Sequence, residues 1–428
     1  MKKALLYLIT SFIVLMCVLA YDIVKFDGNV LLNPLLNING DYATVDTVIK
    51  PVKPTDKLTV TSPDVIPYND VNVTETSDDS EMPEVTEVEE IADEDRGYEF
   101  YFWYLSEKEK KCYREMYNAF SQHASGNIIP TCEQDEMERV VSAIKNDHPE
   151  FFYLGDLGYT HYTMGGQVQR TTLSVKYNDS EAGVDSKRNM IDAEVTAIIN
   201  TIPSGADEYD KVKHVYESII NMTEYDLNSP DNQNITSVLL YKRSVCAGYA
   251  RTMQYILNKI GIPTTIVEGA SLKTGEQHAW NLCKLSDGYY FVDVTWGDAS
   301  YTNNSDSALK VEDVNYDYLL VTSEELLRTH RIDSTVEIPV CTAVENNYYV
   351  REGLYITEYD RNYINGLFTS AYANGQRFVS FKCANRDVFE DAIGDLIKGN
   401  SIFEMLEGDN KTVSYIKDED QRTICFWL

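Results

Sequence analysis

The amino-acid sequence predicts an α+β protein in which a largely helical region precedes a pair of strands. Apolar residues recur at helical spacing in residues 133–146 and again in residues 207–221, and this spacing indicates amphipathic helices. Further along, the apolar runs 275–282 and 289–296 flank a turn signal at residues 286–288, which indicates two antiparallel strands. Together these patterns predict a chain that contains both helices and strands.

The first 95 residues predict a targeting segment and an acidic tether. Lys2 and Lys3 precede an uncharged apolar run over residues 4–20, and this pattern fits either a cleaved signal peptide or an uncleaved signal anchor within residues 1–21. Residues 22–95 lack apolar periodicity, and residues 64–95 contain 13 acidic residues without any Lys or Arg. Such a stretch buries too little apolar surface to offset its ordering entropy. We therefore expect a disordered tether and an extracellular or cell-surface location, with membrane attachment if the segment is uncleaved.

Charge and cysteine content restrict the classes of function. The formal net charge of -31 argues against a nucleic-acid groove or a polybasic membrane surface. Of the eight cysteines, six remain when Cys17 in the apolar run and Cys246 are set aside; in an oxidising compartment these six either form disulfides or remain buried thiols. No cysteine pair or Cys/His cluster has metal-ligand spacing, so we expect no metal and no other cofactor.

The remaining elements are predicted from the same periodicities. Before the central region we expect helices at 107–123, 133–146, 180–202 and 207–221, and strands at 159–164 and 169–177. After it we expect a strand at 316–321, a helix at 323–330 capped by Ser323, and a small α/β module with strands at 348–353, 377–383 and 422–428 and helices at 360–372 and 386–398.

Cys246 is the candidate nucleophile. It follows Ser244 and Val245 at the start of a predicted helix that stops at the sequence Gly261-Ile262-Pro263, with Ser244 as a candidate cap. In the first turn of a helix, the dipole and the free backbone N–H groups favour a thiolate over a thiol. The same N–H groups can stabilise an oxyanion.

His278 and Asp293 are the candidate partners of Cys246. His278 begins the first predicted strand, and Asp293 lies inside the apolar returning strand, where a carboxylate is costly unless it is paired. A two-residue turn on Asp287 and Gly288 would place Asp293 opposite Leu282, roughly 13 Å from His278, so we expect a longer turn. We expect Asp293 to orient His278 rather than to bind a metal, because the sequence offers no other His-rich or Cys-rich cluster nearby.

Three sequence blocks in this order resemble the core of the bacterial transglutaminase-like superfamily. The blocks are Val-Cys-Ala-Gly-Tyr-Ala, His-Ala-Trp-Asn and Val-Asp-Val-Thr-Trp-Gly-Asp, and the likeness to secreted Firmicutes members extends over residues 98–325. The resemblance implies a papain-like α+β core with a catalytic triad on Cys246, His278 and Asp293. Gly297 and Asp298 depart from the two acidic residues that relatives often carry, which puts substrate contacts in doubt. The expected regions are a targeting segment (1–21), a tether (22–95), a transglutaminase-like domain with an N-terminal helical and β extension (96–335), and an accessory α/β module (336–428).

The family includes protein cross-linkers, proteases and other amide-cleaving enzymes, so the resemblance implies a protein or peptide substrate, at the cell surface or cell wall. Water as acceptor is slightly favoured over an amine, because water attacks by default unless a site excludes it. The alternative is a non-catalytic surface binding module that retains the fold. Trp280 and Trp296 are candidates to line the acyl site or to pack the hairpin, Tyr225 is a candidate to approach the substrate, and Cys283 should face away from the site.

Overall fold

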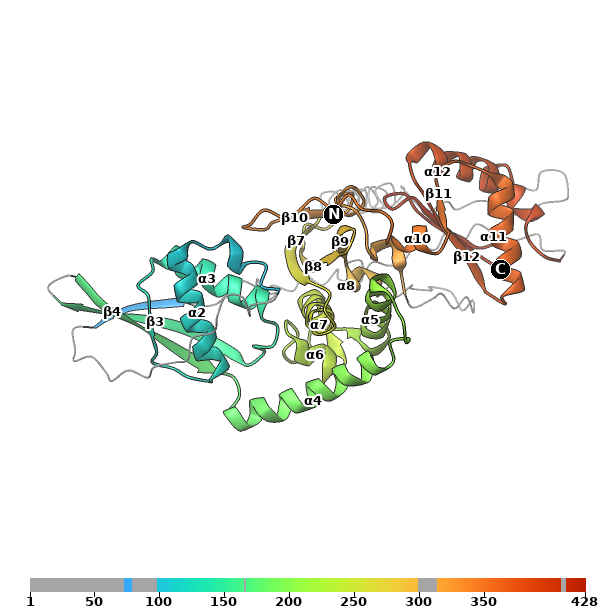
Figure 1. Cartoon of the computed structure of the whole chain (residues 1–428). Helices are drawn as coiled ribbons and strands as arrows, with labels where there is room; N and C mark the ends of the chain where they lie inside the picture. The colour runs from blue at the N-terminus through green and yellow to red at the C-terminus, as the bar shows by residue number, and fades with distance from the viewer. Residues whose placement is uncertain (1–72, 79–97, 165–166, 299–313, 409–412) are drawn as a thin grey trace, which may run out of the picture. The chain divides into compact units, whose positions relative to one another are not determined.

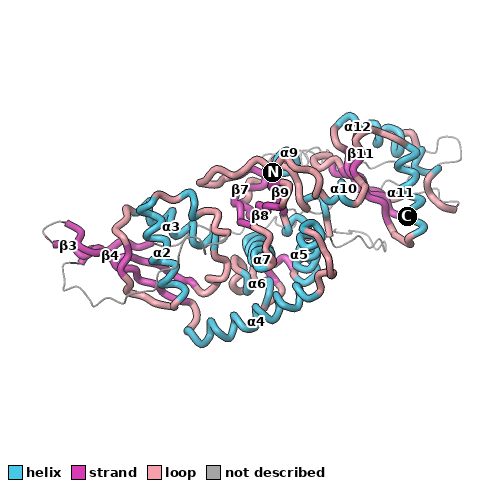
Figure 2. Tube along the Cα trace, in the orientation of Figure 1, coloured by secondary structure: helices cyan, strands magenta, loops and turns pink. Residues whose placement is uncertain are grey.

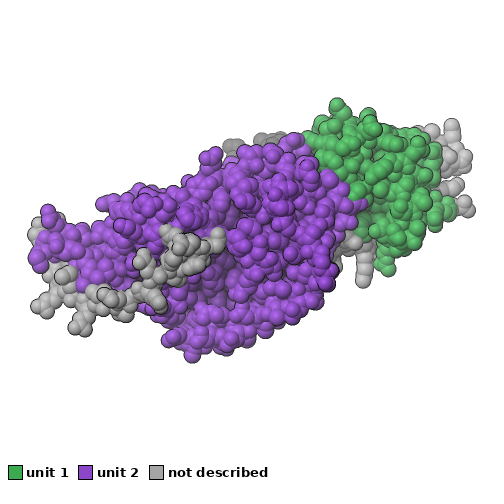
Figure 3. Space-filling model, viewed as in Figure 1, with its two compact units in different colours: residues 1–51, 353–428 green, residues 52–352 purple. Residues whose placement is uncertain are grey.

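The computed structural model describes residues 73–78, 98–164, 167–298, 314–408 and 413–428. The chain divides into two compact units, one of residues 52–352 and the other of residues 353–428 together with 1–51 (Figure 3). The predicted targeting segment and most of the predicted tether lie outside the described residues. Within the described ranges, none of the helices has both the length and the apolarity required to traverse a bilayer.

The larger unit begins with a four-stranded sheet and two helices. Both helices, α2 and α3, start with capping boxes, formed by Ser106 with Glu109 and by Glu133 with Glu136. The apolar stripe predicted for the second helix is buried, and this helix contacts the sheet through a 2.6 Å hydrogen bond from the Tyr159 hydroxyl to Gln134. The strand order is β1-β3-β4-β2, and the elements are β1 (Val73–Asp78), α2 (Glu107–Ser121), β2 (Ile128–Ile129), α3 (Gln134–Asp147), β3 (Leu154–Met164) and β4 (Gln167–Tyr177).

Strand β1 corrects part of the predicted tether. Residues 73–78 pair in parallel with β3, with Val73 opposite Leu157 and Asp78 opposite Tyr162. Pairing of a strand with a sheet edge satisfies main-chain donors and acceptors and does not require apolar periodicity. For this reason the sequence of residues 73–78 does not reveal the strand through apolar periodicity.

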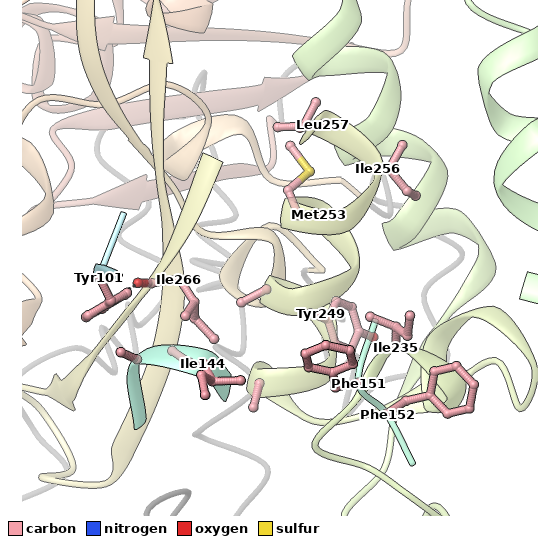
Figure 4. Packing of buried hydrophobic residues seen from close by; sticks show 14 of the residues in the cluster. Tyr101, Ile144, Phe151, Phe152, Ile235, Tyr249, Met253, Ile256, Leu257 and Ile266 are labelled. Carbon is pink, nitrogen blue, oxygen red and sulfur yellow. Dashed lines mark hydrogen bonds between the residues drawn. The ribbon is translucent and has the colours of Figure 1, made fainter. Parts of the chain in front are cut away.

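Four helices follow, and the last of them lies at the centre of the unit (Figure 1). Figure 4 shows Tyr249, Met253, Ile256 and Leu257 projecting from α7 into the core, in which all four side chains are fully buried. The cap of α7 is Val245 rather than the predicted Ser244, because the Ser244 hydroxyl hydrogen-bonds instead to Ser237 and to the carbonyl of Asn232. The helices are α4 (Glu181–Asn200), α5 (Glu208–Met222), α6 (Ile235–Leu239) and α7 (Cys246–Lys259), with the short parallel pair β5 (Glu224–Tyr225) and β6 (Arg243–Ser244) between them.

A second four-stranded sheet packs on α7. Asn281 faces the helix and donates a 2.9 Å hydrogen bond to the carbonyl of Ala250. The opposite face carries a separate apolar cluster that includes Trp280, Trp296 and Tyr318. The strand order is β10-β7-β8-β9, all antiparallel, with β7 (Thr264–Ser271), β8 (Gln277–Leu285), β9 (Gly288–Val292) and β10 (His330–Ile332). Figure 2 labels β7, β8 and β9 beside α7.

The structure corrects several local predictions around this sheet. The β8–β9 turn is not longer than two residues, because Leu285 pairs directly with Gly288. The returning strand ends at Val292, where the Asp293 side chain caps the short helix α8 (Val294–Gly297). The strand predicted at 316–321 is instead the 3₁₀ turn η4 (Tyr316–Tyr318). The helix predicted at 323–330 is shorter, α9 (Ser323–Leu326), and Thr322 caps it rather than Ser323.

The smaller unit is a four-stranded sheet with its own core and two helices. Its boundary at Gly353 lies later than the predicted residue 336. The strand predicted at 348–353 is the helix α10 (Tyr348–Arg351) of the larger unit, where Tyr348 stacks on Tyr316 with centroids 4.0 Å apart. The sheet order is β11-β12-β14-β13, from β11 (Tyr355–Ile356), α11 (Arg361–Ala373), β12 (Phe378–Cys383), α12 (Arg386–Ala392, extended by a π turn, Ile393–Lys398), β13 (Tyr415–Asp418) and β14 (Thr423–Trp427).

The predicted α+β class is confirmed: helices and strands form separate layers in both units. The question of disulfides is also answered for the described residues. None of the seven cysteines in the described ranges forms a disulfide, and the six other than Cys246 are buried or, for Cys425, half-buried.

Candidate active site

Cys246 is the first residue of α7 and is partly exposed. The first hydrogen bond of the helix runs from the Tyr249 N–H to the Val245 carbonyl, so the N–H groups before Tyr249 stand outside the helical ladder. Close packing supports this end of the helix, because a Cβ on Gly248 would lie 2.0 Å from the Ser244 hydroxyl oxygen. The position therefore combines a positive helix end with N–H donors outside the helical ladder.

His278 lies between Cys246 and Asp293. Its Nε2 donates a 2.7 Å hydrogen bond to Oδ2 of Asp293, which leaves Nδ1 for Cys246, whose side chain lies near enough to the ring to raise its pKa. Burial alone would lower the pKa of His278, but the Asp293 carboxylate and then the Cys246 thiol raise it to about 10. The imidazole is thus held as a cation at neutral pH.

Asp293 accepts four hydrogen bonds and is completely buried. Its Oδ1 accepts from the backbone N–H groups of Thr295 and Trp296, both at 3.0 Å. Its Oδ2 accepts from Nε2 of His278 and from Nε2 of His330, the latter at 3.0 Å. Burial alone would raise the pKa of Asp293, yet His278 and then His330 hold it well below its usual range. The carboxylate is therefore ionised and has its lone pairs satisfied.

Strand register explains how His278 reaches Asp293. Val292 pairs with Asn281, so Asp293 follows at the position opposite Trp280, diagonally across from His278. Diagonal neighbours on one face of a sheet lie within reach of long side chains. A direct cross-strand pair, and with it the longer turn, is therefore unnecessary.

His330 is the residue of this site that the sequence analysis did not identify. It begins β10, which pairs with β7 and not with its neighbours in sequence, and no local motif marks it. One ligand atom each from His278, Asp293 and His330 lies within 4.8 Å of the others, and two imidazoles with a carboxylate suit a transition metal. The expectation that no further metal ligand lies near Asp293 is therefore wrong. In this structure both imidazoles donate to the carboxylate.

The weaker candidates occupy different surroundings. Trp280 and Trp296 are buried, with ring centroids 5.8 and 5.6 Å from that of His278, so they pack around the imidazole. Tyr225 lies close to Cys246: burial first, and then the Cys246 side chain, raise its pKa well above the usual value. Cys283 faces away as predicted, in the core beneath α7, where burial raises its pKa to about 12.

Asp298 also contributes to this region, because it binds a side chain of α7, the helix that begins with Cys246. Its Oδ2 accepts a 2.6 Å hydrogen bond from the hydroxyl of Tyr249, one turn along α7 from Cys246. Burial and the Asp298 carboxylate together raise the pKa of Tyr249 far above its usual value, so the hydroxyl remains the donor. The link ties α7 to the end of α8.

Comparison with known proteins finds one family model that matches part of the chain. Residues 197–294 match the family model of the transglutaminase-like superfamily, and this span contains Cys246, His278 and Asp293. The predicted resemblance is confirmed over these residues. The curated proteins contain no match.

Solved structures with some likeness cover only parts of both chains. One is a TGase (14% identity, TM-score 0.25), covering 36% of this chain and 55% of that one. Another, described as a proposed cysteine protease from Cytophaga hutchinsonii, has 13% identity and a TM-score of 0.23, over 33% of this chain and 66% of that one. The periplasmic domain of TgpA from Pseudomonas aeruginosa, bound to ethylmercury, has 20% identity and a TM-score of 0.21, over 30% of this chain and 57% of that one. This chain thus spans less than two thirds of each, and likeness at this level carries no argument about its activity.

Proposed function

Because residues 197–294 match the family model of the transglutaminase-like superfamily, we propose that this chain is a thiol enzyme that cleaves or exchanges amide bonds through a thioester on Cys246. The observation that carries the proposal is the contact sequence Cys246–His278–Asp293, in which a buried carboxylate raises the pKa of the central imidazole to about 10. A nucleophile, a base and an orienting group in this order form the arrangement that activates a thiol.

The proposed acylation uses these groups directly. The Cys246 thiolate attacks the amide carbonyl carbon, a C–S bond forms, and the carbonyl π electrons move to oxygen. The free N–H groups at the start of α7 stabilise this oxyanion. When the tetrahedral intermediate collapses, the C–N bond breaks, Nδ1 of His278 gives its proton to the amine, and a thioester remains.

Deacylation determines the reaction class. Water or a primary amine gives a proton to Nδ1 of His278 and attacks the thioester carbonyl, which releases Cys246 as the thiolate and yields a carboxylic acid or a new amide. We favour water, so the proposed activity is that of a cysteine protease or amidase on protein or peptide substrates. The proposal that it acts outside the cytoplasm rests on the uncharged run over residues 4–20 behind Lys2 and Lys3.

The test is product analysis with the full chain. A mixture of peptides and folded surface proteins is incubated in H₂¹⁸O, with and without a primary amine, and analysed by mass spectrometry. Uptake of ¹⁸O that requires Cys246 supports hydrolysis, and amine uptake that requires Cys246 supports transamidation. Identical products from wild type and Cys246→Ala, together with no selective labelling of Cys246 by iodoacetamide, would favour a non-catalytic binding module instead.

A further inference from the structure

We propose that His330 is a positioning residue of this site: its imidazole holds the Asp293 carboxylate that orients His278. The inference rests on the proposed function and adds to it a fourth side chain. In this inference His330 acts on His278 through Asp293, to which it donates a hydrogen bond.

His330 must donate a hydrogen bond to Asp293. Asp293 is ionised, since its pKa lies well below the usual range, and an ionised carboxylate can only accept hydrogen bonds. The Nε2 atoms of His278 and His330 lie 2.7 and 3.0 Å from the same oxygen, Oδ2, so both nitrogens must carry a proton. His330 thereby fixes the direction in which Oδ2 presents its remaining lone pair to His278.

The second ring nitrogen of His330, Nδ1, also has a hydrogen-bonding partner. Its Nδ1 lies 2.9 Å from the hydroxyl of Thr329, and that hydroxyl in turn accepts a 3.4 Å hydrogen bond from Tyr318. The same hydroxyl donates to the carbonyl of Leu326 at 3.3 Å, so the Thr329 oxygen lies between the Tyr318 hydroxyl and Nδ1 of His330. A chain of side chains therefore runs from Tyr318 through Thr329, His330 and Asp293 to His278.

Tertiary packing brings β10 close enough for this contact. Gly269 on β7 lies opposite both Ile332 of β10 and His278 of β8. A Cβ at Gly269 would lie 1.9 Å from the carbonyl oxygen of Arg331 and 2.6 Å from the Trp280 ring. Only glycine permits this approach, and His330 immediately precedes Arg331.

Aromatic rings enclose His330 and keep water away from the pair. Its ring centroid lies 4.3 Å from that of Trp296, 4.9 Å from Trp280 and 5.6 Å from Tyr318, and only 1% of the residue is exposed. Water therefore has no access to replace the His330 donor, and a buried carboxylate that loses a donor is less stable as an anion. The titratable groups that face His330 are Asp293, His278 and Tyr318, from three different elements.

The experiment measures alkylation of Cys246 by iodoacetamide against pH, with the labelled peptide quantified by mass spectrometry, alongside kcat, KM and melting temperature. His330→Phe keeps a flat ring in the aromatic enclosure but removes the donor, and His330→Gln restores an N–H near the same place. His161→Phe is the matched control, since His161 is a buried histidine bonded to a threonine, Thr171, in the first sheet. Asp293→Asn shows the full effect of losing the carboxylate.

We expect His330→Phe to move the acid limb of the alkylation profile to higher pH and to lower kcat about tenfold or more, with KM nearly unchanged. His330→Gln should recover most of both, and His161→Phe should leave both unchanged. If His330→Phe loses its fold, Thr329→Val, which removes the partner of Nδ1, should give a smaller shift in the same direction.

Three outcomes overturn the inference. If the alkylation profiles of the His330 variants superimpose on that of wild type while that of Asp293→Asn does not, only the His330 inference fails. If wild type already shows the profile of an ordinary thiol and Asp293→Asn does not change it, the proposed function fails as well. If EDTA reproduces the His330→Phe effect in wild type and zinc reverses it, His330 is a metal ligand rather than a donor to Asp293. The alkylation measurement distinguishes these outcomes even when no substrate is known.

Discussion

Asp293 immediately follows strand β9, and its Oδ2 lies 2.7 Å from Nε2 of His278 on the neighbouring strand β8. The same side chain caps α8 through two backbone N–H groups. One carboxylate therefore terminates the strand, starts the helix and orients the imidazole. Because these roles share one group, substitutions at the site should affect stability and activity to different degrees.

Cys246→Ala should abolish activity and change the free energy of unfolding by less than about 1 kcal/mol, because the thiol is small and only partly buried. Turnover and chemical denaturation measure the two effects. The matched control is Cys283→Ala: Cys283 is fully buried in the core, so this variant should stay active and lose about 1–2 kcal/mol. Residual activity above about a tenth of wild type in Cys246→Ala would refute the nucleophile assignment.

Asp293→Asn should lower kcat by orders of magnitude with little change in KM. The amide can keep its oxygen on the N–H groups of Thr295 and Trp296, which places its NH₂ group against the Nε2–H groups of His278 and His330. At least one imidazole must then change tautomer, and His278 would present the wrong nitrogen to Cys246. Steady-state kinetics and imidazole ¹⁵N spectra test this. An unchanged His278 tautomer with full activity would contradict the triad.

The stability of the fold should depend on pH through His278. Its pKa rises from about 6.5 in the unfolded chain to about 10 in the folded one. A raised pKa contributes stability that is complete below about pH 6.5 and is lost as pH rises toward 10, by at most about 1.4 kcal/mol per pH unit. Urea unfolding at pH 6.5, 8 and 9.5 measures this slope.

The control for that slope is Asp293→Asn, which removes the charge that raises the pKa of His278. His148 is also held near a pKa of about 10 against burial, by Glu150 and Glu99, and it contributes to both proteins alike. The difference between wild type and Asp293→Asn therefore isolates His278. Equal slopes in the two proteins would show that the ion pair does not form.

Removing β1 should damage the larger unit. A chain that lacks residues 1–65 retains β1, whereas one that lacks residues 1–95 exposes the edge of β3 with which residues 73–78 pair. An uncovered strand edge promotes association between chains. We expect the longer deletion to melt at a lower temperature and to aggregate in light scattering, while the shorter deletion matches the full chain. Identical behaviour of the two deletions would restore the view that the whole of residues 22–95 is a tether.

Much of the fold was predictable because its signals are local. The stripe of Met137, Val140, Val141 and Ile144 belongs to a single helix and is buried as a unit. The start of α7 at Cys246 and the start of β8 next to His278 follow from short sequence blocks. In these cases the residues that determine the structure lie within one turn or one strand of each other.

Other features depend on which segments meet in space. The β8–β9 turn was predicted to be longer than two residues, whereas Leu285 pairs directly with Gly288, because register is set by the burial of both strands and not by the turn residues alone. The end of β9 depends on the two N–H groups that Asp293 captures, and β1 depends on a strand edge about 80 residues further along the chain.

The same division holds for the site. Sequence alone determined the residue types and order of Cys246, His278 and Asp293, because each lies in a block with its own local signal. Only the tertiary structure could add His330, since β10 reaches Asp293 by pairing with β7 about 60 residues earlier in the chain. A contact between distant segments leaves no periodicity in either of them, because it is made by the packing of whole strands around a buried charge that must be satisfied.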